Sequence, residues 1–366
     1  MTGGSGVGAP PRQQGPAAPD APLLLERLDT LDMLGATLAL PEQVAAAVAL
    51  AADLDGLPSR DQVEQVVVLG MGGSGIAGDV VHAVAGPFMS VPVVVAKGYE
   101  APSFVNEGTL CIAISFSGAT EETIEAATQA AAAGARMVVM ATGGPLTDLA
   151  PGWGAPLVVL PDGIPMPRAG IGAVSIPPLV VLEQTGLFPG ASQWIAQAVA
   201  QLERRRDALL VPGNEAEELA RAIGRTMPLV YGGGDLGLVA ALRWKNQVNE
   251  NAKAPSFVHA LPELTHNEIA GWGQHGDVTR QVLTLVALRH DHEHPQISRR
   301  FALVEEILDE VMAGVHEVRA EGEGALAQLF DLVLFGDMVS LHLAFQAGVD
   351  PGPIPVLDEI KRRLTQ

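Results

Sequence analysis

Two hydrophobic patterns alternate over the first half of the chain. Short apolar runs rich in β-branched residues lie at residues 65–70, 91–98, 109–115, 136–142 and 156–161. Between them, residues 75–86 and 121–135 space their apolar side chains as one face of a helix does. Strands that read as continuous apolar runs and alternate with helices are typical of a parallel sheet with both faces covered. This half is therefore predicted to be an α/β unit.

The same order of elements begins again in the second half. Residues 227–235 (MPLVYGGGD) read as a strand that ends in a glycine loop, roughly 160 residues after the first such unit. Further strands are predicted at 282–289 and 314–322, and helices at 325–348 and 355–364. The chain is therefore predicted to be an α/β protein of two domains, each a parallel sheet flanked by helices on both faces (an α/β/α sandwich).

The other segments set the expected domain limits. Residues 1–22 are mostly Gly, Pro, Ala and Gln, which bury too little apolar surface to offset ordering entropy, so a disordered tail is expected. Helical patterns cover residues 23–54 and 171–222. We expect an N-terminal domain at 23–210 and a C-terminal domain at 211–366.

Composition and charge argue against several kinds of partner. The chain has 366 residues, 48% of them hydrophobic, and a formal net charge of 22 − 42 = −20. This charge disfavours nucleic acid as a partner, and an anionic substrate would need a local positive site. The most apolar stretches, residues 45–52 and 171–182, are too short or too interrupted by proline to span a membrane.

The single cysteine indicates a reducing compartment. Cys111 lies in the apolar run LCIAIS and is expected to be a buried thiol that has no partner for an internal disulfide. The N-terminal residues lack the basic stretch and apolar segment of a secretory signal. We therefore expect a cytoplasmic protein.

The first glycine loop, residues 69–79 (LGMGGSGIAGD), joins a strand to a helix. Its glycines match the G-x-G-x-x-G dinucleotide pattern, but Lys97 ends the next strand, close to where that pattern expects an acidic residue. The amides of Gly72 and Gly73 and the hydroxyl of Ser74 suit a small phosphate or sugar ligand at a helix N-terminus. Two alternatives stay open: nicotinamide binding, and glycines that only allow close strand–helix packing.

The second loop, residues 115–123 (SFSGATEET), is rich in hydroxyl groups. Ser115, Ser117 and Thr120 lie beside Gly118 at the predicted start of a helix. Such a turn offers side-chain donors and unpaired backbone amides, which form a phosphate cradle without a guanidinium group. The alternative is an ordinary N-cap cluster, although these hydroxyls exceed what one cap needs.

Four motifs occur together in this chain: GMGGSGIAGD at 70–79, SFSGATEET at 115–123, PRAGIG at 167–172, and NENAK…PE…HNEIAGW at 249–272. Together they resemble the bifunctional phosphoglucose/phosphomannose isomerases, which consist of two sugar isomerase (SIS) domains. The likeness runs from about Leu23 to the C-terminus. The first loop reads GSGIAG where the family often has Ala and Ile-Gly, and the second reads SGAT where Asn commonly precedes the Thr, which leaves fine specificity in question. The resemblance implies isomerisation of a sugar 6-phosphate.

Residues 249–272 carry the candidate acid–base groups, in a stretch that reads neither as a packed helix nor as a strand. Converting an aldose phosphate to a ketose phosphate requires a base that removes the C2 proton and returns it to C1. Glu250 is the candidate base, near the end of a helix expected from about Leu236 to before Pro255, and the resemblance implies the same residue. The alternative is an ordinary exposed charge at a helix end.

His266 follows in a polar loop flanked by proline. A lone histidine is more often structural than catalytic, but an imidazole titrates near neutral pH and can exchange a proton with the ring oxygen of a sugar. Acid–base groups of this kind contribute about 10²–10⁴ in rate. The resemblance implies that His266 acts in the site of the partner subunit of a homodimer.

Two cations complete the candidate site. Arg168 is held between proline and glycine in a loop, where packing explains it poorly, and it could stabilise the negative charge of a cis-enediolate. Its alternative is a surface or interface ion pair. The resemblance implies a catalytic lysine in the last helix, which indicates Lys361, with Arg362 as a rival. Cations near a helix C-terminus are also favoured without any function.

The segment RHDHEHP, 289–295, gathers His290, His292 and His294 with two acids. A solvated loop is the preferred interpretation, and a zinc or nickel site is the alternative. Isomerisation through an enediol needs no metal, and no cofactor is expected. The resemblance implies an isomerase of glucose 6-phosphate, mannose 6-phosphate and fructose 6-phosphate. The alternatives are an isomerase for mannose 6-phosphate only and a non-catalytic sugar-phosphate-binding SIS regulator.

Overall fold

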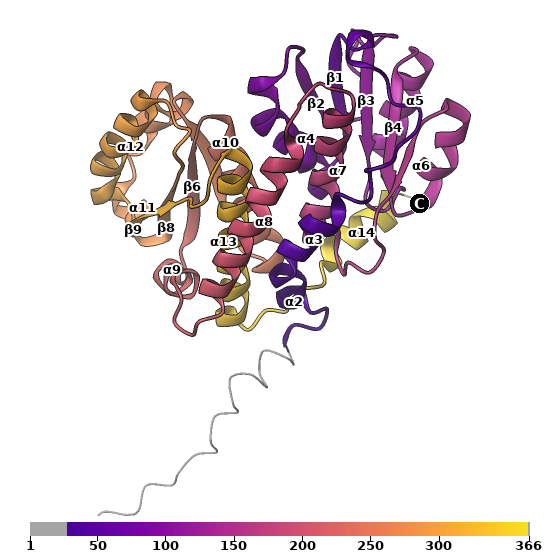
Figure 1. Ribbon diagram of the computed structural model, residues 1–366. Helices are drawn as coiled ribbons and strands as arrows, with labels where there is room; N and C mark the ends of the chain where they lie inside the picture. Colours follow the sequence, from indigo (N-terminus) through magenta and orange to yellow (C-terminus); the bar gives the residue numbers. More distant parts are fainter. Residues whose placement is uncertain (1–27, 365–366) are drawn as a thin grey trace, which may run out of the picture.

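The computed structural model describes residues 28–364, so the tail predicted at 1–22 lies outside the described residues. The described chain forms two parallel sheets, with strand orders β2-β1-β3-β4-β5 and β7-β6-β8-β9 (Figure 1). The strands are β1 (Gln65–Leu69), β2 (Val93–Ala96), β3 (Thr109–Ile114), β4 (Arg136–Ala141), β5 (Leu157–Val159), β6 (Met227–Gly233), β7 (Phe257–Leu261), β8 (Leu283–Arg289) and β9 (Gly314–Arg319). The predicted fold, two parallel sheets flanked by helices, is confirmed.

Helices cover both faces of the first sheet. These helices are α4 (Gly72–Val84), α5 (Glu121–Ala132), α6 (Gly144–Leu149) and α7 (Ile171–Gln184). Alternate residues of one strand point to opposite faces. Ile112 on β3 accordingly lies in the core that includes residues of α4 and α7, whereas its neighbour Cys111 packs with residues of α5 and α6. Cys111 is fully buried, as predicted, and burial raises the pKa of its thiol to about 12.

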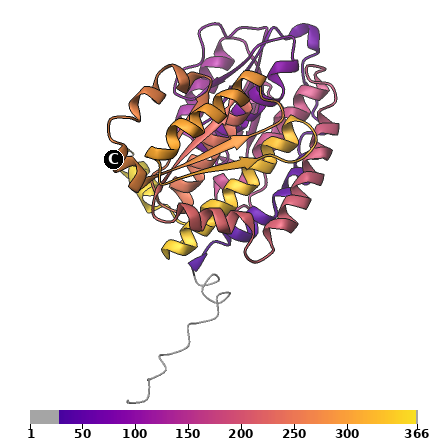
Figure 2. The ribbon, with the colours of Figure 1, turned by 90° about the vertical axis from the view of Figure 1, so that its left-hand side faces the viewer.

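The second sheet is covered in the same way. Its helices are α10 (Gly234–Asn251), α11 (Gly276–Val282), α12 (Pro295–Leu308) and α13 (Ala325–Ala347). Val230 on β6 shares a core with α10 and α13, and its neighbour Tyr231 packs with Phe301 of α12. Figure 2 views the molecule from this side, with the orange helices of the second half in front of its strands. We call the face under α10 the inner face and the face under α12 the outer face.

The two halves share one continuous core. Helix α4 packs on α10, and α8 (Ala191–Leu209) packs on α13, so the inner helices of both halves meet between the two sheets. The remaining α-helices are α2 (Met33–Leu38), α3 (Leu40–Ala47), α9 (Glu215–Ile223) and α14 (Pro355–Leu364). The domain boundary expected at 210/211 falls between α8 and α9. This packing fixes the position of α4 relative to α10, and the candidate site lies where these two helices meet.

Residues 257–261 form strand β7, although the sequence around them reads as irregular. The strand pairs with β6 on one side only and is the edge of the second sheet. Prolines lie near both ends of the strand, and its first three residues are exposed or half-buried. The strand therefore lacks the continuous apolar run that marks the central strands of this protein. The reading of this stretch as containing no strand is therefore wrong.

The helix α13 has the length and composition of a membrane span. Its most apolar window has a mean hydropathy of 1.4, but 94% of that window is buried inside the protein. A helix that is apolar on all sides and buried in this way is the central helix of a packed core.

Candidate active site

The glycine loop after β1 brings the start of α4 against the strand. A Cβ on Gly75 would stand 2.8 Å from the carbonyl oxygen of Gly70, so position 75 requires glycine. Gly72, the first residue of α4, has φ of 51°, and a Cβ built on it would meet no described atom within 4 Å. The amino end of α4 is therefore open to a ligand, and its free amides favour an anion there.

The second loop is folded by its own hydroxyl groups. The buried Ser115 donates from Oγ to Oγ1 of Thr120 over 2.9 Å, and the exposed Ser117 accepts from the amide of Ala119 over 3.3 Å. Gly118 has φ of 64°, and a Cβ there would stand 1.6 Å from the carbonyl oxygen of Gly143. The loop is thus fixed by packing, with Thr120 at the N-cap of α5.

Direct contacts join the two loops to the segment of Arg168. The hydroxyl of Ser74 accepts a hydrogen bond of 2.9 Å from the amide of Phe116, which lies in the second loop. A Cβ on Gly73 would stand 3.4 Å from the carbonyl of Pro167 and 3.5 Å from the amide nitrogen of Arg168. The structure therefore brings the first loop, the second loop and Arg168 together. Ser74 is buried between them, where its hydroxyl positions the second loop.

Arg168 is buried, with only 3% of its side chain exposed. Its Nε donates to Asn251 over 2.8 Å, and its Nη2 donates to the carbonyls of Pro351 and Gly352 over 2.6 and 2.7 Å. Its Nη1 is buried without a hydrogen-bond partner among the described residues and lies 3.6 Å from Oε2 of Glu250. Burial lowers the pKa of the guanidinium. Three hydrogen bonds from Nε and Nη2 thus fix the group and leave Nη1 facing Glu250.

Glu250 lies in the last turn of α10, where its side chain is 32% exposed beside Arg168. Lys253, which the sequence does not single out, follows it with φ of 53°. The ammonium of Lys253 donates to the carbonyl of Glu250 over 2.7 Å and to that of Pro351 over 2.9 Å. Burial, followed by repulsion from Arg168, lowers the pKa of Lys253 to about 8. The site therefore has the local positive charge that a protein of net charge −20 needs to hold an anion.

His266 does not join this group within one chain. It is exposed at the end of a 3-10 turn, Glu263–His266, directly after β7. Leu264 of that turn packs in the outer-face core with Tyr231, and Thr265 accepts a hydrogen bond from Arg300 of α12. Glu250 belongs to α10 on the inner face of the same sheet. His266 thus lies in the turn after β7, whereas Glu250 lies at the end of α10, before β7.

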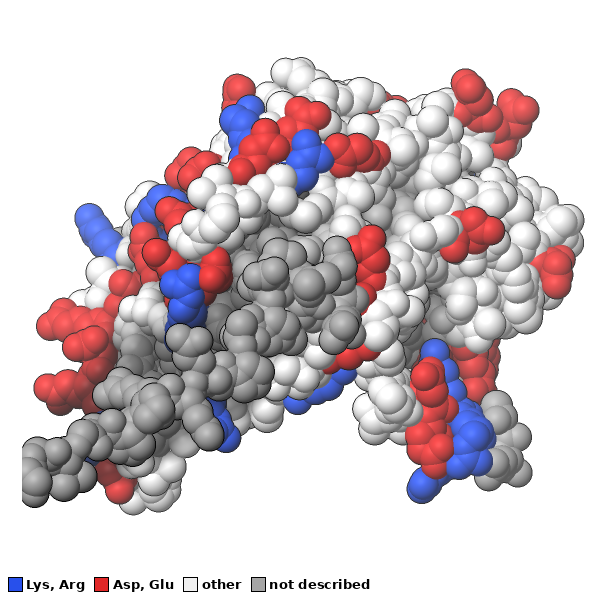
Figure 3. All heavy atoms as spheres, turned by 90° about the horizontal axis from the view of Figure 1, so that it is seen from below, with Lys and Arg blue, Asp and Glu red and all other residues white. Residues whose placement is uncertain are grey.

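Lys361 lies on α14, a helix with exposed side chains that projects from the body; Figure 3 shows basic and acidic side chains together on it. Glu359 pairs with Arg362 and Arg363 on the same helix. The helix begins three residues after Gly352, whose carbonyl binds Arg168. At 1.5 Å per residue, Lys361 is about 9 Å along the axis from Pro355. The anchor at Gly352 thus ties the start of α14 to the site.

Most of the histidine segment is the solvated loop that its sequence suggests, with Asp291, His292 and His294 exposed, and His290 is the exception. His290 is 4% exposed and donates from Nε2 to the carbonyl of Gly233 over 2.8 Å. His294 caps α12 by accepting from the amide of Gln296 over 3.1 Å. Within residues 28–364, no group of three or more His, Cys, Asp or Glu side chains is placed to hold a metal ion. The segment is therefore ordered, because it forms the junction between β8 and α12.

Sequence patterns alone could not reveal several residues of the site. Arg168 donates hydrogen bonds to Asn251 and to the carbonyls of Pro351 and Gly352. Each of these acceptors is more than 80 residues away in the sequence. Gln43 in α3 accepts from the amide of Gly172 over 2.7 Å and fixes the segment after Arg168. A local signal exists only for Lys253, which lies three residues after Glu250.

Comparisons with known proteins agree with this geometry. The family described as bacterial phospho-glucose isomerase C-terminal SIS domain matches residues 213–364, and the SIS domain family matches residues 61–151. Curated relatives named bifunctional phosphoglucose/phosphomannose isomerase include one from Caldicellulosiruptor bescii, 32% identical over 89% of this chain and 97% of the relative. Another, from Thermoplasma acidophilum, is 30% identical over 85% of this chain and 93% of the relative.

A solved structure supports the fold. The crystal structure of a glucose-6-phosphate isomerase like protein from Thermus thermophilus superposes with a TM-score of 0.60 at 20% identity, over 93% of this chain and 98% of that one. At this identity the likeness concerns the fold alone. The family follows from the curated relatives, which the chain matches over nearly their whole length. This chain belongs to the family of bifunctional phosphoglucose/phosphomannose isomerases.

Proposed function

We propose that this chain is an aldose–ketose isomerase that interconverts glucose 6-phosphate and mannose 6-phosphate with fructose 6-phosphate through a cis-enediolate. The observation that carries the proposal is the pair formed by Arg168 and Glu250. A buried guanidinium nitrogen without a hydrogen-bond partner lies 3.6 Å from a half-buried carboxylate, beside a hydroxyl-rich loop at a helix N-terminus. A base, a fixed positive charge and an anion cradle are the groups that this reaction needs.

The phosphate group would bind at the two loops of the first half. The amino ends of α4 and α5 supply amides, and Ser117 and Thr120 supply hydroxyl groups. Ser115 holds Thr120, and Gly72 leaves room for the phosphate to approach the amides. Each helix N-terminus adds about 0.3–1 kcal/mol for a nearby anion, and hydrogen bonds to a charged group add about 1.5–3 kcal/mol each.

The proton transfer would take place at the opposite end of the substrate. Glu250 removes the proton from C2 of the open-chain aldose, and the electron pair forms the C1–C2 double bond as O1 becomes negative. Nη1 of Arg168 donates to this oxygen, where charge develops. The proton of the C2 hydroxyl moves to O1, and Glu250 returns its proton to C1, which yields the ketose. Atoms and electrons balance, and the sum of the steps is a 1,2-hydrogen shift.

We further propose that the active unit is a homodimer in which His266 serves the site of the partner subunit and opens the sugar ring. The proposal is supported by the positions of the two residues, since Glu250 lies at the end of α10, before β7, and His266 lies in the exposed turn after β7. It is also supported by the unpaired edge of β7 and by an apolar groove of about 740 Å³ beside it, lined in part by Phe257 and Trp272.

Three finer points belong to the same proposal. Lys361, with Arg362 as the rival, would reach the substrate from α14, whose start is fixed beside Arg168. The division into domains at residues 23–210 and 211–366 assigns the phosphate loops to one half and Glu250 to the other. A cytoplasmic location suits a chain whose one cysteine is a buried thiol.

A coupled assay for fructose 6-phosphate formed from each aldose phosphate tests the activity. Glu250→Gln should lower kcat by about 10²–10⁴ with both substrates, because the amide cannot accept the C2 proton. Glu306→Gln, at an exposed glutamate of α12 away from the site, is the matched control and should keep the wild-type rate. Activity on mannose 6-phosphate alone would establish the narrower isomerase, and binding without turnover would establish a regulator.

Subunit complementation tests the shared site separately. Glu250→Gln and His266→Ala chains, each inactive as homodimers, are mixed and allowed to exchange subunits. Heterodimers should regain activity, because one of their two sites then has both intact residues. Verified exchange without recovered activity would show that each chain builds its site alone.

A further inference from the structure

The second half of the chain repeats the elements that build the phosphate site of the first half. Strands β6, β7, β8 and β9 occupy the places of β1, β2, β3 and β4 in the two strand orders, and α10 takes the place of α4. The close pair Gly70 and Gly75 has a counterpart in Gly232 and Gly237, where a Cβ on Gly232 would stand 2.1 Å from the carbonyl oxygen of Gly237. The two halves therefore present the same kind of strand–helix junction.

A cavity of about 280 Å³ lies at this second junction, between the two halves. Gly234 begins α10 with φ of 58°, as Gly72 begins α4 with φ of 51°. His290 directly follows β8 as Ser115 directly follows β3. Phe88, from the 3-10 turn Gly86–Phe88 that follows α4, also lines the cavity. The cavity is thus the counterpart of the candidate active site, with different side chains.

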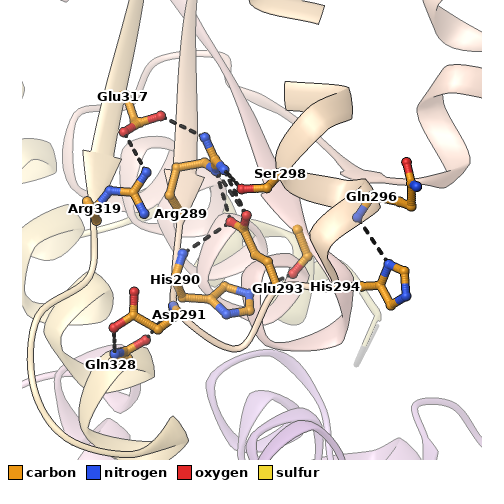
Figure 4. A network of polar contacts seen from close by, with 11 residues as sticks. Arg289, His290, Asp291, Glu293, His294, Gln296, Ser298, Glu317, Arg319 and Gln328 are labelled. Carbon is orange, nitrogen blue, oxygen red and sulfur yellow. Dashed lines mark hydrogen bonds and ion pairs between the residues drawn. The ribbon is translucent and has the colours of Figure 1, made fainter. Parts of the chain in front are cut away.

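The side chains of this cavity are unsuited to a phosphate. Asp235 follows Gly234 in the first turn of α10, where Gly73 follows Gly72 in the other half. Its carboxylate would repel a dianion at the helix N-terminus. Glu293 also lines the cavity, but Arg289 binds it through hydrogen bonds of 2.9 Å, as Figure 4 shows. The hydroxyl cradle is absent at this junction, since residues 290–294 read His-Asp-His-Glu-His.

The imidazole of His290 has one nitrogen without a hydrogen-bond donor beside it in the described part of the chain. Its Nε2 donates to the carbonyl of Gly233 over 2.8 Å, and burial lowers the pKa of the ring, so the ring is neutral and Nδ1 is an acceptor. His290 is 96% buried, and Nδ1 has no hydrogen-bond partner among the residues that the structure describes. A buried acceptor without a partner is costly, and an O–H donor in the cavity would satisfy it.

We propose that this cavity binds an uncharged polyhydroxy compound of the size of a sugar or a sugar alcohol. One hydroxyl donates to Nδ1 of His290, and another donates to the carboxylate of Asp235 at the cavity mouth. The amides at the start of α10 donate to hydroxyl oxygens. The ring of Phe88, 61% exposed, covers the apolar face of the ligand. The site is separate from the candidate active site, because it lies at the other end of α4 and α10.

Calorimetric titration with D-glucitol tests the proposal, with inorganic phosphate as the comparison. D-glucitol should bind with Kd on the order of millimolar, as suits a small uncharged ligand. Phe88→Ala should weaken binding at least about fivefold through lost apolar contact, and Asp235→Asn should weaken it as well. Phe104→Ala, which removes another exposed phenyl ring, is the control and should leave Kd unchanged.

Two further measurements locate the ligand. In ¹⁵N-histidine spectra, D-glucitol should shift the Nδ1 resonance of His290, and Ser115→Ala/Ser117→Ala should bind D-glucitol as the wild type does. Loss of binding in that double variant would place the ligand in the active site and overturn the proposal. Absence of any saturable binding, or a site that takes phosphate in preference to D-glucitol, would show that the cavity holds only water.

Discussion

Replacing Arg168 by lysine keeps the positive charge of the site and removes its geometry. The guanidinium makes three hydrogen bonds, through Nε to Asn251 and through Nη2 to Pro351 and Gly352, and leaves Nη1 toward Glu250. A lysine ammonium is a single point charge that cannot keep these anchors and also face the substrate. Removal of one fixed donor to a developing oxyanion costs about 10²–10³ in kcat, or about 2.7–4 kcal/mol.

The expected kinetic result of Arg168→Lys is a fall of kcat by about 10²–10³ with KM changed less than about threefold, because the phosphate loops stay intact. Two lost hydrogen bonds at about 1.5 kcal/mol each also lower stability by about 3 kcal/mol. At about 2–4 °C per kcal/mol, the unfolding midpoint should fall by about 6–12 °C. The coupled assay is run well below that midpoint, and circular dichroism follows unfolding.

Arg299→Lys is the matched control, because Arg299 is exposed on α12, and its kcat and unfolding midpoint should equal those of the wild type. If Arg168→Lys kept kcat within about threefold, Nη1 would have no part in stabilising the enediolate. If the loss lay only in KM, Arg168 would bind substrate and transition state equally, which also contradicts the proposed role.

Three further predictions concern other parts of the site. Ser115→Ala/Ser117→Ala should raise KM for fructose 6-phosphate by at least about tenfold with a smaller change in kcat in the coupled assay, because the phosphate loses its hydrogen bond from Ser117 and Thr120 loses the hydroxyl that holds it. Gly118→Ala should lower the free energy of unfolding by more than about 2 kcal/mol in a urea titration, because its Cβ would overlap the carbonyl of Gly143 at a φ of 64°. The pKa of Lys253 is about 8 in the folded protein and about 10.4 unfolded, so the unfolded chain binds more protons between these values. Stability should therefore rise with pH from about 8 to 10.4, by less than the full linkage since the side chain is partly exposed, and Lys253→Met should lose this rise.

Controls separate these three effects from general damage. Ser90→Ala changes an exposed serine outside the loops and should leave KM unaltered. A Gly118→Ala protein as stable as the wild type would mean that the loop of Gly143 can move aside. A Lys253→Met protein that keeps the rise in stability above pH 8 would assign the titration to another group.

Sequence patterns predicted the sheets and the ligand loops because both depend on local signals. Continuous apolar runs marked the central strands, and glycines with clustered hydroxyl groups marked the two strand–helix junctions. The edge strand β7 was missed, because an edge with flanking prolines lacks the burial that creates such a pattern. The anchors of Arg168 were also missed, since hydrogen bonds to Pro351 and Gly352 depend on how two distant segments pack.

The histidine segment shows a different limit of sequence reasoning. His290 reads as part of a solvated loop because polar residues surround it, yet it is buried against Gly233. Its burial follows from its position directly after a central strand, at the junction that corresponds to Ser115 in the other half. Alignment of the two halves by their secondary structure, rather than by residue identity, reveals this relation.

A crystal structure with fructose 6-phosphate bound tests the central claim most directly. The account predicts the phosphate within hydrogen-bond distance of Ser117 and Thr120, at the amino ends of α4 and α5. It also predicts C1 and C2 of the same molecule within about 3–3.5 Å of the carboxylate of Glu250, with one oxygen on Nη1 of Arg168. A substrate whose phosphate lies elsewhere, or whose C1–C2 bond lies out of reach of Glu250, would contradict the account.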